Sequence, residues 1–193
     1  MGTRQRLLAC ALDELERSGL DGFSLRAVGG KAGLSPMAVY RHFANKEDLL
    51  RALGEEAFGA WQRRVESIKE RDFDRWLRRV LRSYVEFSLD EPGRFDVCFV
   101  LKTSVERVYP EDFRAGKSPA ITLMAKRIEA AQQDGKLREG DPIELALLIW
   151  AQLHGLVMLH RAGRFSLKRS EYLRLCQQCT ELTMRGLRTS KTA

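Results

Sequence analysis

Cysteine and histidine are scarce in this chain of 193 residues, which has four cysteines and three histidines. So few cysteines, in a chain whose N-terminus shows no secretory signal pattern, argue against a framework of disulfide bonds. His42, His154 and His160 have no nucleophile, carboxylate pair or metal motif beside them, so the sequence gives little support for an enzyme. We therefore expect no catalysis, no cofactor and no metal site.

Long uncharged apolar runs are also missing. A membrane-spanning helix needs roughly 18 or more apolar residues, whereas the best run, residues 145–153, already contains Gln152. There is no hairpin pattern, internal repeat or low-complexity segment. A hydrophobic fraction of 44% is enough for a buried core. We expect a globular, cytoplasmic protein with no membrane partner.

The positive charge of the chain is unevenly spread. The formal net charge is +7, which suits a nucleic-acid partner. The first fifty residues, however, carry seven basic and six acidic side chains, so this segment is nearly neutral. Recognition of a nucleic acid there would depend on a few placed contacts rather than on a basic patch.

What the chain does have is helical periodicity. An apolar stripe within residues 4–18 ends at Gly19, and residues 73–89 repeat apolar side chains every three or four positions. The pattern predicts an all-α fold of about nine helices: a three-helix, helix-turn-helix head in residues 1–46 and a helical bundle in residues 47–193. Besides the helix pair of the head, the expected helices cover about 4–18, 45–69, 73–89, 95–101, 119–134, 142–162 and 167–188, with a polar loop over 109–117.

Three helix-capping residues stand close together in the head. Ser24, Ser35 and Asn45 can each accept a hydrogen bond from an orphan backbone N–H at a helix start. Pro36 suits the first helical position because its φ is fixed and it lacks the N–H donor. Gly33 precedes that helix, where a tight turn favours a residue that tolerates positive φ. The segment therefore predicts helix, tight turn, helix.

The second helix of this pair, predicted over residues 36–43, has an inner and an outer face. Val39 and Phe43 lie four apart and should pack inward. The outer face holds a proline, a methionine, a tyrosine, an arginine and a histidine. Such a face suits a DNA major groove, where the N-terminal part of a recognition helix reads base edges. On spacing alone, a surface helix in an ordinary bundle is the alternative.

The block over residues 32–50, AGLSPMAVYRHFANKEDLL, resembles the DNA-binding signature of the tetracycline-repressor (TetR) family of bacterial transcriptional regulators. The resemblance covers residues 3–58, and its most specific part is the Tyr-x-His-Phe-x-x-Lys spacing at 40–46. One departure is Gly29-Gly30, where the family usually has better helix formers. Two mid-helix glycines should cost about 1 kcal/mol each relative to alanine and soften this helix.

The resemblance implies roles for side chains of the head. Tyr40, His42 and Lys46 match family positions that contact DNA phosphates. Ser24, at a helix N-terminus, is a further candidate for a phosphate contact. For base readout we select two arginines, which can bond guanine, and a proline and a methionine, which can touch a thymine methyl group. The predicted DNA-binding set is Ser24, Arg26, Ser35, Pro36, Met37, Tyr40, Arg41, His42 and Lys46.

A second similarity lies in the bundle. Trp150, His154 and Gly155 resemble the Trp-His-Gly signature of one class of C-terminal domain in the same family. Trp150 and His154 share a helix face, and Gly155 would let a neighbouring helix come close. A core tryptophan beside a hydrogen-bonded histidine is the alternative, since aromatic stripes are more often core than pocket. The predicted set for binding a small apolar or aromatic effector is Trp61, Trp76, Tyr84, Phe87, Phe95, Phe99, Met124, Trp150 and His154.

The family resemblance also implies a homodimer that binds a near-palindromic operator and represses transcription until an effector enters the bundle. The last two helices are more apolar than a lone bundle needs, although these residues could also fill the core. Cys176 and Cys179 have metal or redox spacing, but without a second pair they read as buried or interface thiols. An architectural DNA protein without sequence preference is the alternative function, and the nearly neutral head disfavours it. The predicted dimer surface is Leu147, Leu156, Leu159, Tyr172, Leu175, Cys176, Cys179 and Leu182.

Overall fold

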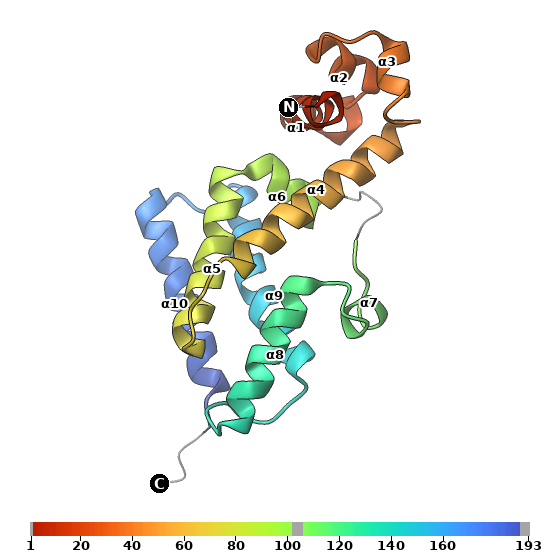
Figure 1. The fold of residues 1–193 in the computed structure, drawn as a ribbon. Coiled ribbons are helices and arrows are strands. Elements are labelled where there is room, and N and C mark those ends of the chain that lie inside the picture. The colour runs from red at the N-terminus through yellow and green to blue at the C-terminus, as the bar shows by residue number, and fades with distance from the viewer. Residues whose placement is uncertain (1, 102–105, 190–193) are drawn as a thin grey trace. The chain divides into compact units, whose positions relative to one another are not determined.

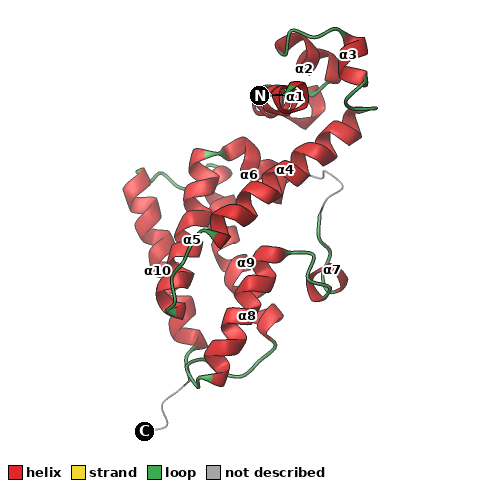
Figure 2. Ribbon diagram, viewed as in Figure 1, coloured by secondary structure: helices red, strands yellow, loops and turns green. Residues whose placement is uncertain are grey.

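The computed structural model describes residues 2–101 and 106–189 of the chain. Within these ranges the named elements are all helices (Figures 1 and 2), which confirms the predicted all-α fold. The described part contains ten helices where about nine were expected. The additional one, α7 (Glu111–Arg114), is a single turn inside the predicted polar loop.

The chain divides into two compact units. The first comprises Met1–Trp61 with Asp90–Glu106, and the second comprises Gln62–Leu89 with Arg107–Ala193. The α4 helix begins in the first unit and ends in the second. The sequence predicts a different boundary, after residue 46, between a DNA-binding head and a helical bundle. That boundary separates the parts by function and stays a prediction.

The first unit is built around α1, whose apolar stripe is buried as predicted. Gly19 has a φ of 64°, as expected for a helix end, but the chain resumes one more helical turn. The α1 helix packs against α2 and α6, where the N–H of Gly93 donates to Oε1 of Glu16 at 3.0 Å. The helices of this unit are α1 (Thr3–Gly22), α2 (Leu25–Lys31), α3 (Pro36–Tyr40), most of α4 (Lys46–Glu66) and α6 (Pro92–Phe99).

The second unit is a bundle in which α9 packs against α8 and α10. Proline stands at the start of α8 and α9, as predicted, and the Asp141 carboxylate caps α9 by accepting the N–H of Ile143 at 2.8 Å. The helices of this unit are α5 (Phe73–Asp90), α7, α8 (Pro119–Gln133), α9 (Pro142–Arg161) and α10 (Arg169–Leu187).

The α9 helix is long and apolar enough to cross a membrane, judged by length and composition alone. In this structure it serves as a bundle helix, because Leu145, Ile149, Leu153 and Val157 are buried along one face. Most of the periodic apolar residues of α5 are buried, as their spacing predicts, while Phe73 and Leu89 at its two ends are half-buried.

Candidate nucleic-acid interface

Three side chains cap the helix starts of the head, as the sequence predicts. The Ser24 hydroxyl oxygen accepts the N–H of Ala27 at 3.2 Å, and that of Ser35 accepts the N–H of Ala38 at 3.3 Å. At the start of α4, Asn45 Oδ1 accepts the N–H of Asp48 at 2.7 Å. Each oxygen satisfies an orphan donor, so these caps set where α2, α3 and α4 begin.

The turn from α2 to α3 depends on glycine. Gly33 has a φ of 64°, and the next residue, Leu34, donates its N–H to the Gly29 carbonyl at 2.9 Å. Gly29 is buried, and a Cβ there would lie 2.7 Å from Cγ2 of Val39. A Cβ on Gly30 would meet nothing within 4 Å. Of the two adjacent glycines that depart from the family pattern, only Gly29 is therefore required by the close packing of α2 against Val39.

The α3 helix has a buried inner face and an exposed outer face. Val39 and Phe43 are buried, whereas Met37 is 70% exposed and Tyr40 57% exposed. The predicted helix end at Phe43 is wrong: α3 ends at Tyr40, because two N–H groups converge on the Val39 carbonyl at 2.9 and 3.0 Å and tighten the last turn. The exposed members of the predicted DNA-binding set are Ser24, Arg26, Ser35, Pro36, Met37, Tyr40, Arg41 and His42.

Lys46, the remaining member of that set, is engaged inside the head. Its Nζ donates to the Leu20 carbonyl at 2.8 Å and lies 5.8 Å from the centroid of the Phe23 ring. An ammonium has three donors, so a phosphate contact by Lys46 stays a prediction beside this structural role. Sequence reasoning did not select Arg4, whose guanidinium lies 5.3 Å from the centroid of the Phe43 ring.

A buried carboxylate joins α1 to α2. Glu14 is 1% exposed and pairs with Arg17 at 2.6 Å and with Lys31 of α2 at 3.2 Å. Lys31 also bonds to Asp13. The hydrogen bond from Arg17 is the main cause that holds the pKa of Glu14 below its ordinary value, with Lys31 adding to it against the opposing effect of burial. Asp13 and Glu14 are thus neutralised by partners within the head.

The residues predicted to bind an effector fall in both compact units. In the first unit, the Phe99 ring lies 5.0 Å from Phe95 and 6.1 Å from Trp61, centroid to centroid. In the second unit Trp76, Tyr84, Phe87 and Met124 are buried. The Trp76 ring is covered by Arg127, whose guanidinium is 4.6 Å from the ring centroid. These side chains form core in the structure, and their contact with an effector stays a prediction.

The Trp-His-Gly residues of α9 meet Tyr84 of α5. Tyr84 Oη and His154 Nδ1 are hydrogen-bonded at 2.7 Å, and the Trp150 ring lies 5.4 Å from the His154 ring. Burial lowers the pKa of His154, which favours the neutral imidazole. Gly155 is exposed and a Cβ there would meet nothing within 4 Å, so no helix of the described chain approaches it, and the expected approach of a neighbouring helix stays a prediction for a second copy.

The predicted dimer surface needs a correction at two positions. Tyr172 and Cys176 are buried inside the second unit, so they cannot present surface to a second copy. Burial raises the pKa of the Cys176 thiol to about 11. Leu182 is 67% exposed and Leu159 46% exposed, and Leu148, which sequence reasoning missed, is 56% exposed on α9. The half-buried members of the set are Leu147, Leu156, Leu175 and Cys179.

Comparison with known proteins identifies the family of the two parts. Residues 7–53 match the family of bacterial regulatory proteins called tetR, and residues 77–179 match the tetracyclin repressor-like C-terminal domain. Among curated proteins, none has a significant match to this chain.

Solved structures share the fold over nearly the whole chain. A protein of unknown function from Rhodococcus sp. RHA1 is 25% identical, with a TM-score of 0.81 over 98% of this chain and 97% of that one. A TetR-family transcriptional regulator from Pectobacterium atrosepticum is 25% identical, with a TM-score of 0.66 over 97% and 95%. One from Marinobacter aquaeolei VT8 is 19% identical, with a TM-score of 0.74 over 97% and 96%. Because the C-terminal family model alone spans more than half of the chain, the protein belongs to the TetR family of transcriptional regulators.

Proposed function

We propose that this regulator is a cytoplasmic repressor that binds a palindromic operator as a homodimer and is released by a small apolar or aromatic effector. The observation that carries the proposal is α3, which has a buried inner face and an outer face of exposed methionine, tyrosine, arginine and histidine. A short capped helix with such a face fits the major groove, where its side chains reach base edges.

Within the head, the proposal divides the contacts with DNA into two kinds. Tyr40, His42 and Lys46 bind phosphates and set the register of the head, while Ser24 and Ser35 lie at helix starts where the backbone favours phosphate. The second kind reads base edges in the major groove. Its residues are Arg26, Pro36, Met37 and Arg41.

The homodimer would form through α9 and α10. Leu148, Leu159 and Leu182 are large apolar side chains left exposed on these helices, and the exposed Gly155 leaves room for another backbone. A two-fold dimer places two heads on half-sites about 34–36 Å apart, or a multiple of a helical turn. A near-palindromic operator follows from that symmetry.

The effector part of the proposal rests on the second unit. Tyr84, Trp150 and His154 combine aromatic surface with one neutral hydrogen-bonded pair, which suits an effector that is mainly apolar and carries few polar atoms. The protein would have one conformation that binds DNA and one that does not. Release requires that the effector have a higher affinity for the conformation that does not bind DNA.

The test is selection of bound DNA from a random library with the full-length protein. We expect recovery of a palindrome, and loss of its binding on addition of an aromatic compound found by screening. A salt-dependent affinity that is identical for the recovered DNA and for random DNA would instead support an architectural role. Retained turnover of a substrate by protein that binds no operator would support an enzyme.

A further inference from the structure

The head contains positive charge that its own carboxylates do not neutralise. Of the seven basic side chains in the first fifty residues, three are engaged inside the head. Arg17 and Lys31 pair with Glu14 at 2.6 and 3.2 Å. Lys46 donates to the Leu20 carbonyl at 2.8 Å. The other four have no ion pair with any residue that the structure describes, and they are Arg4, Arg6, Arg26 and Arg41.

Two of these arginines lie at the start of α1 and have no proposed role, since Arg26 and Arg41 are the proposed base readers. Arg4 precedes the buried Leu7 by three residues, so it continues the face of α1 that packs into the head. Arg6 is two residues further along, which places it about 200° away around the helix axis. Arg4 and Arg6 therefore have the same charge and are both exposed, but they lie on different faces of α1.

The Arg4 side chain is positioned at the end of α3. Its guanidinium carbon lies 5.3 Å from the centroid of the Phe43 ring, and Phe43 directly follows the exposed His42. Phe43 is 2% exposed, so its ring is a fixed part of the core. An aromatic ring attracts a guanidinium without acting as the acceptor of a conventional hydrogen bond, so the N–H donors of Arg4 remain available to a ligand.

The carboxylate of Asp48 also lies near Arg4, but it has partners of its own. It accepts the N–H of Ala44 at 3.1 Å and pairs with Arg51 at 2.5 Å. The hydrogen bond from Ala44 is the main cause that holds the pKa of Asp48 below its ordinary value, and the charge of Arg4 makes a minor contribution. Asp48 is therefore satisfied without Arg4, whose charge is left for a partner outside the chain.

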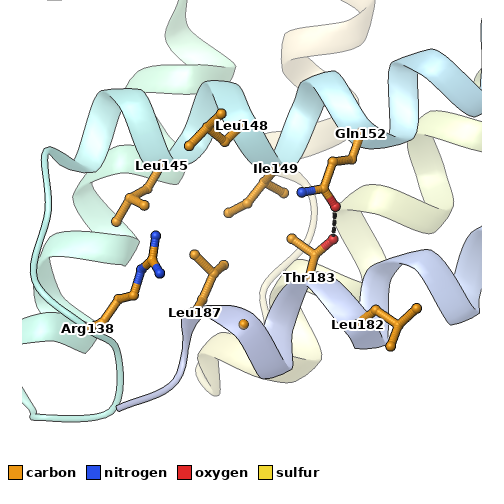
Figure 3. A pocket seen from close by; sticks show the side chains of 9 residues that line it. Arg138, Leu145, Leu148, Ile149, Gln152, Leu182, Thr183 and Leu187 are labelled. Carbon is orange, nitrogen blue, oxygen red and sulfur yellow. Dashed lines mark hydrogen bonds between the residues drawn. The ribbon is translucent and has the colours of Figure 1, made fainter. Parts of the chain in front are cut away.

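Arg138, in the second unit, also has no ion pair among the described residues. Figure 3 shows it at a groove between α9 and α10 that Leu148 and Leu182 help to line. The proposed dimer covers these two leucines, so Arg138 belongs to a surface directed at a second copy. Arg4, in contrast, belongs to the unit that carries α3 and lies beside the proposed phosphate contacts.

We propose that Arg4 binds a phosphate of the DNA backbone at the edge of the groove that α3 enters. A guanidinium can donate two N–H bonds to one phosphate, and the contact with Phe43 limits the freedom that Arg4 loses on binding. The contact would fix register and add affinity on every sequence, because phosphates carry no sequence information. The inference rests on the proposed function, and it extends the DNA interface from α2, α3 and the start of α4 to α1.

The test measures how DNA binding by the full-length protein depends on salt. Fluorescence anisotropy gives the dissociation constants of the palindrome recovered by selection and of random DNA between about 50 and 200 mM KCl. Arg4→Gln should reduce the slope of log affinity against log salt by about 0.9 for each bound head, because one phosphate per head is no longer neutralised. It should weaken the binding of the two DNAs by a similar factor.

Two further variants separate the contact from a general loss of charge. Arg6→Gln removes the same charge from the start of α1 on a different face, so it should keep the salt slope of the unmodified protein. Arg4→Lys keeps the charge and should also keep the slope, but it should weaken both DNAs by roughly threefold because an ammonium lacks the planar fork of donors. Circular dichroism should show the same helix content for all three variants, since both arginines are exposed.

The outcome for Arg4→Gln decides the proposal. The proposal is overturned if this variant keeps the salt slope of the unmodified protein, or if Arg6→Gln reduces the slope as much. It is also overturned if Arg4→Gln weakens binding of the palindrome but not of random DNA, which would make Arg4 a base reader. A failure of the proposed function is distinguishable from these results, because the unmodified protein would then show no preference for the palindrome.

Discussion

Gly29 and Gly30 are adjacent in α2 but have different surroundings, which gives opposite predictions for alanine. Gly30→Ala should raise the free energy of unfolding by about 0.5–1 kcal/mol, since the position is exposed and has open space. Gly29→Ala should lower it by about 1–3 kcal/mol, because the added methyl group would press on the buried Val39. Urea unfolding of both variants measures the two changes, and equal effects of one sign would contradict the assignment.

Arg41 and Tyr40 are both exposed at the outer face of α3, but they are proposed to contact different parts of DNA. Arg41→Ala should cost about 1–3 kcal/mol on the operator and relax specificity at one base pair. Tyr40→Phe should weaken operator and random DNA alike, because a phosphate contact carries no sequence information. Fluorescence anisotropy on both DNAs measures this division, and equal losses for Arg41→Ala on the two would refute it.

Lys46 is a less suitable test residue than Tyr40. Its ammonium donates to the Leu20 carbonyl, so Lys46→Ala should weaken all DNA sequences alike and also loosen the head. A loss of DNA binding in this variant needs an unfolding curve beside it before it is assigned to a phosphate contact.

At the scale of elements, the link between α1 and α2 depends on pH through Glu14. The pKa of Glu14 is lowered in the folded chain. At pH values above the ordinary pKa of 4.5 the ionised carboxylate therefore stabilises the head, and this stabilisation is lost as the pH falls and the carboxylate is protonated. Glu14→Gln should therefore be less stable than the unmodified protein at pH 7, with a difference that shrinks below pH 4. Denaturant unfolding across pH measures it. Glu139→Gln, at an exposed acid without an ion pair among the described residues, is the control; a difference independent of pH would contradict this role.

The sequence predicts a feature of an element well when that feature is set by residues within the same helical turn, and poorly when it is set by contacts between two helices. Caps at Ser24, Ser35 and Asn45 act within one helical turn, so the residue types predicted them directly. The burial of Tyr172 could not be predicted, because which side of α10 is covered depends on how α9 packs against it, and the spacing within α10 does not show this. The Glu14–Lys31 pair was missed for the same reason, since it depends on how α1 crosses α2.

At the scale of the whole molecule, the family and its all-α fold were predictable because one specific spacing, Tyr-x-His-Phe-x-x-Lys, marks the head. The surface that joins two copies was predicted only in part. Spacing shows that a helix has two faces, but it does not show which apolar face remains open after the bundle is packed. In the structure, Leu148 and Leu182 are on the open face and Cys176 is not.

The dimer proposal can be tested at Leu182. This side chain is 67% exposed, so Leu182→Arg should leave the protomer folded while it places two buried charges in a two-fold interface. If the substitution costs about 1.4 kcal/mol of dimerisation free energy at each of the two symmetry-related positions, the dissociation constant of the dimer rises by about 100-fold. Analytical ultracentrifugation measures the change, and operator affinity should fall with it because both heads must bind together. Val108→Arg, at an exposed apolar residue that belongs to neither α9 nor α10, should leave the dimer intact; a Leu182→Arg dimer as stable as that control would exclude this face as the interface.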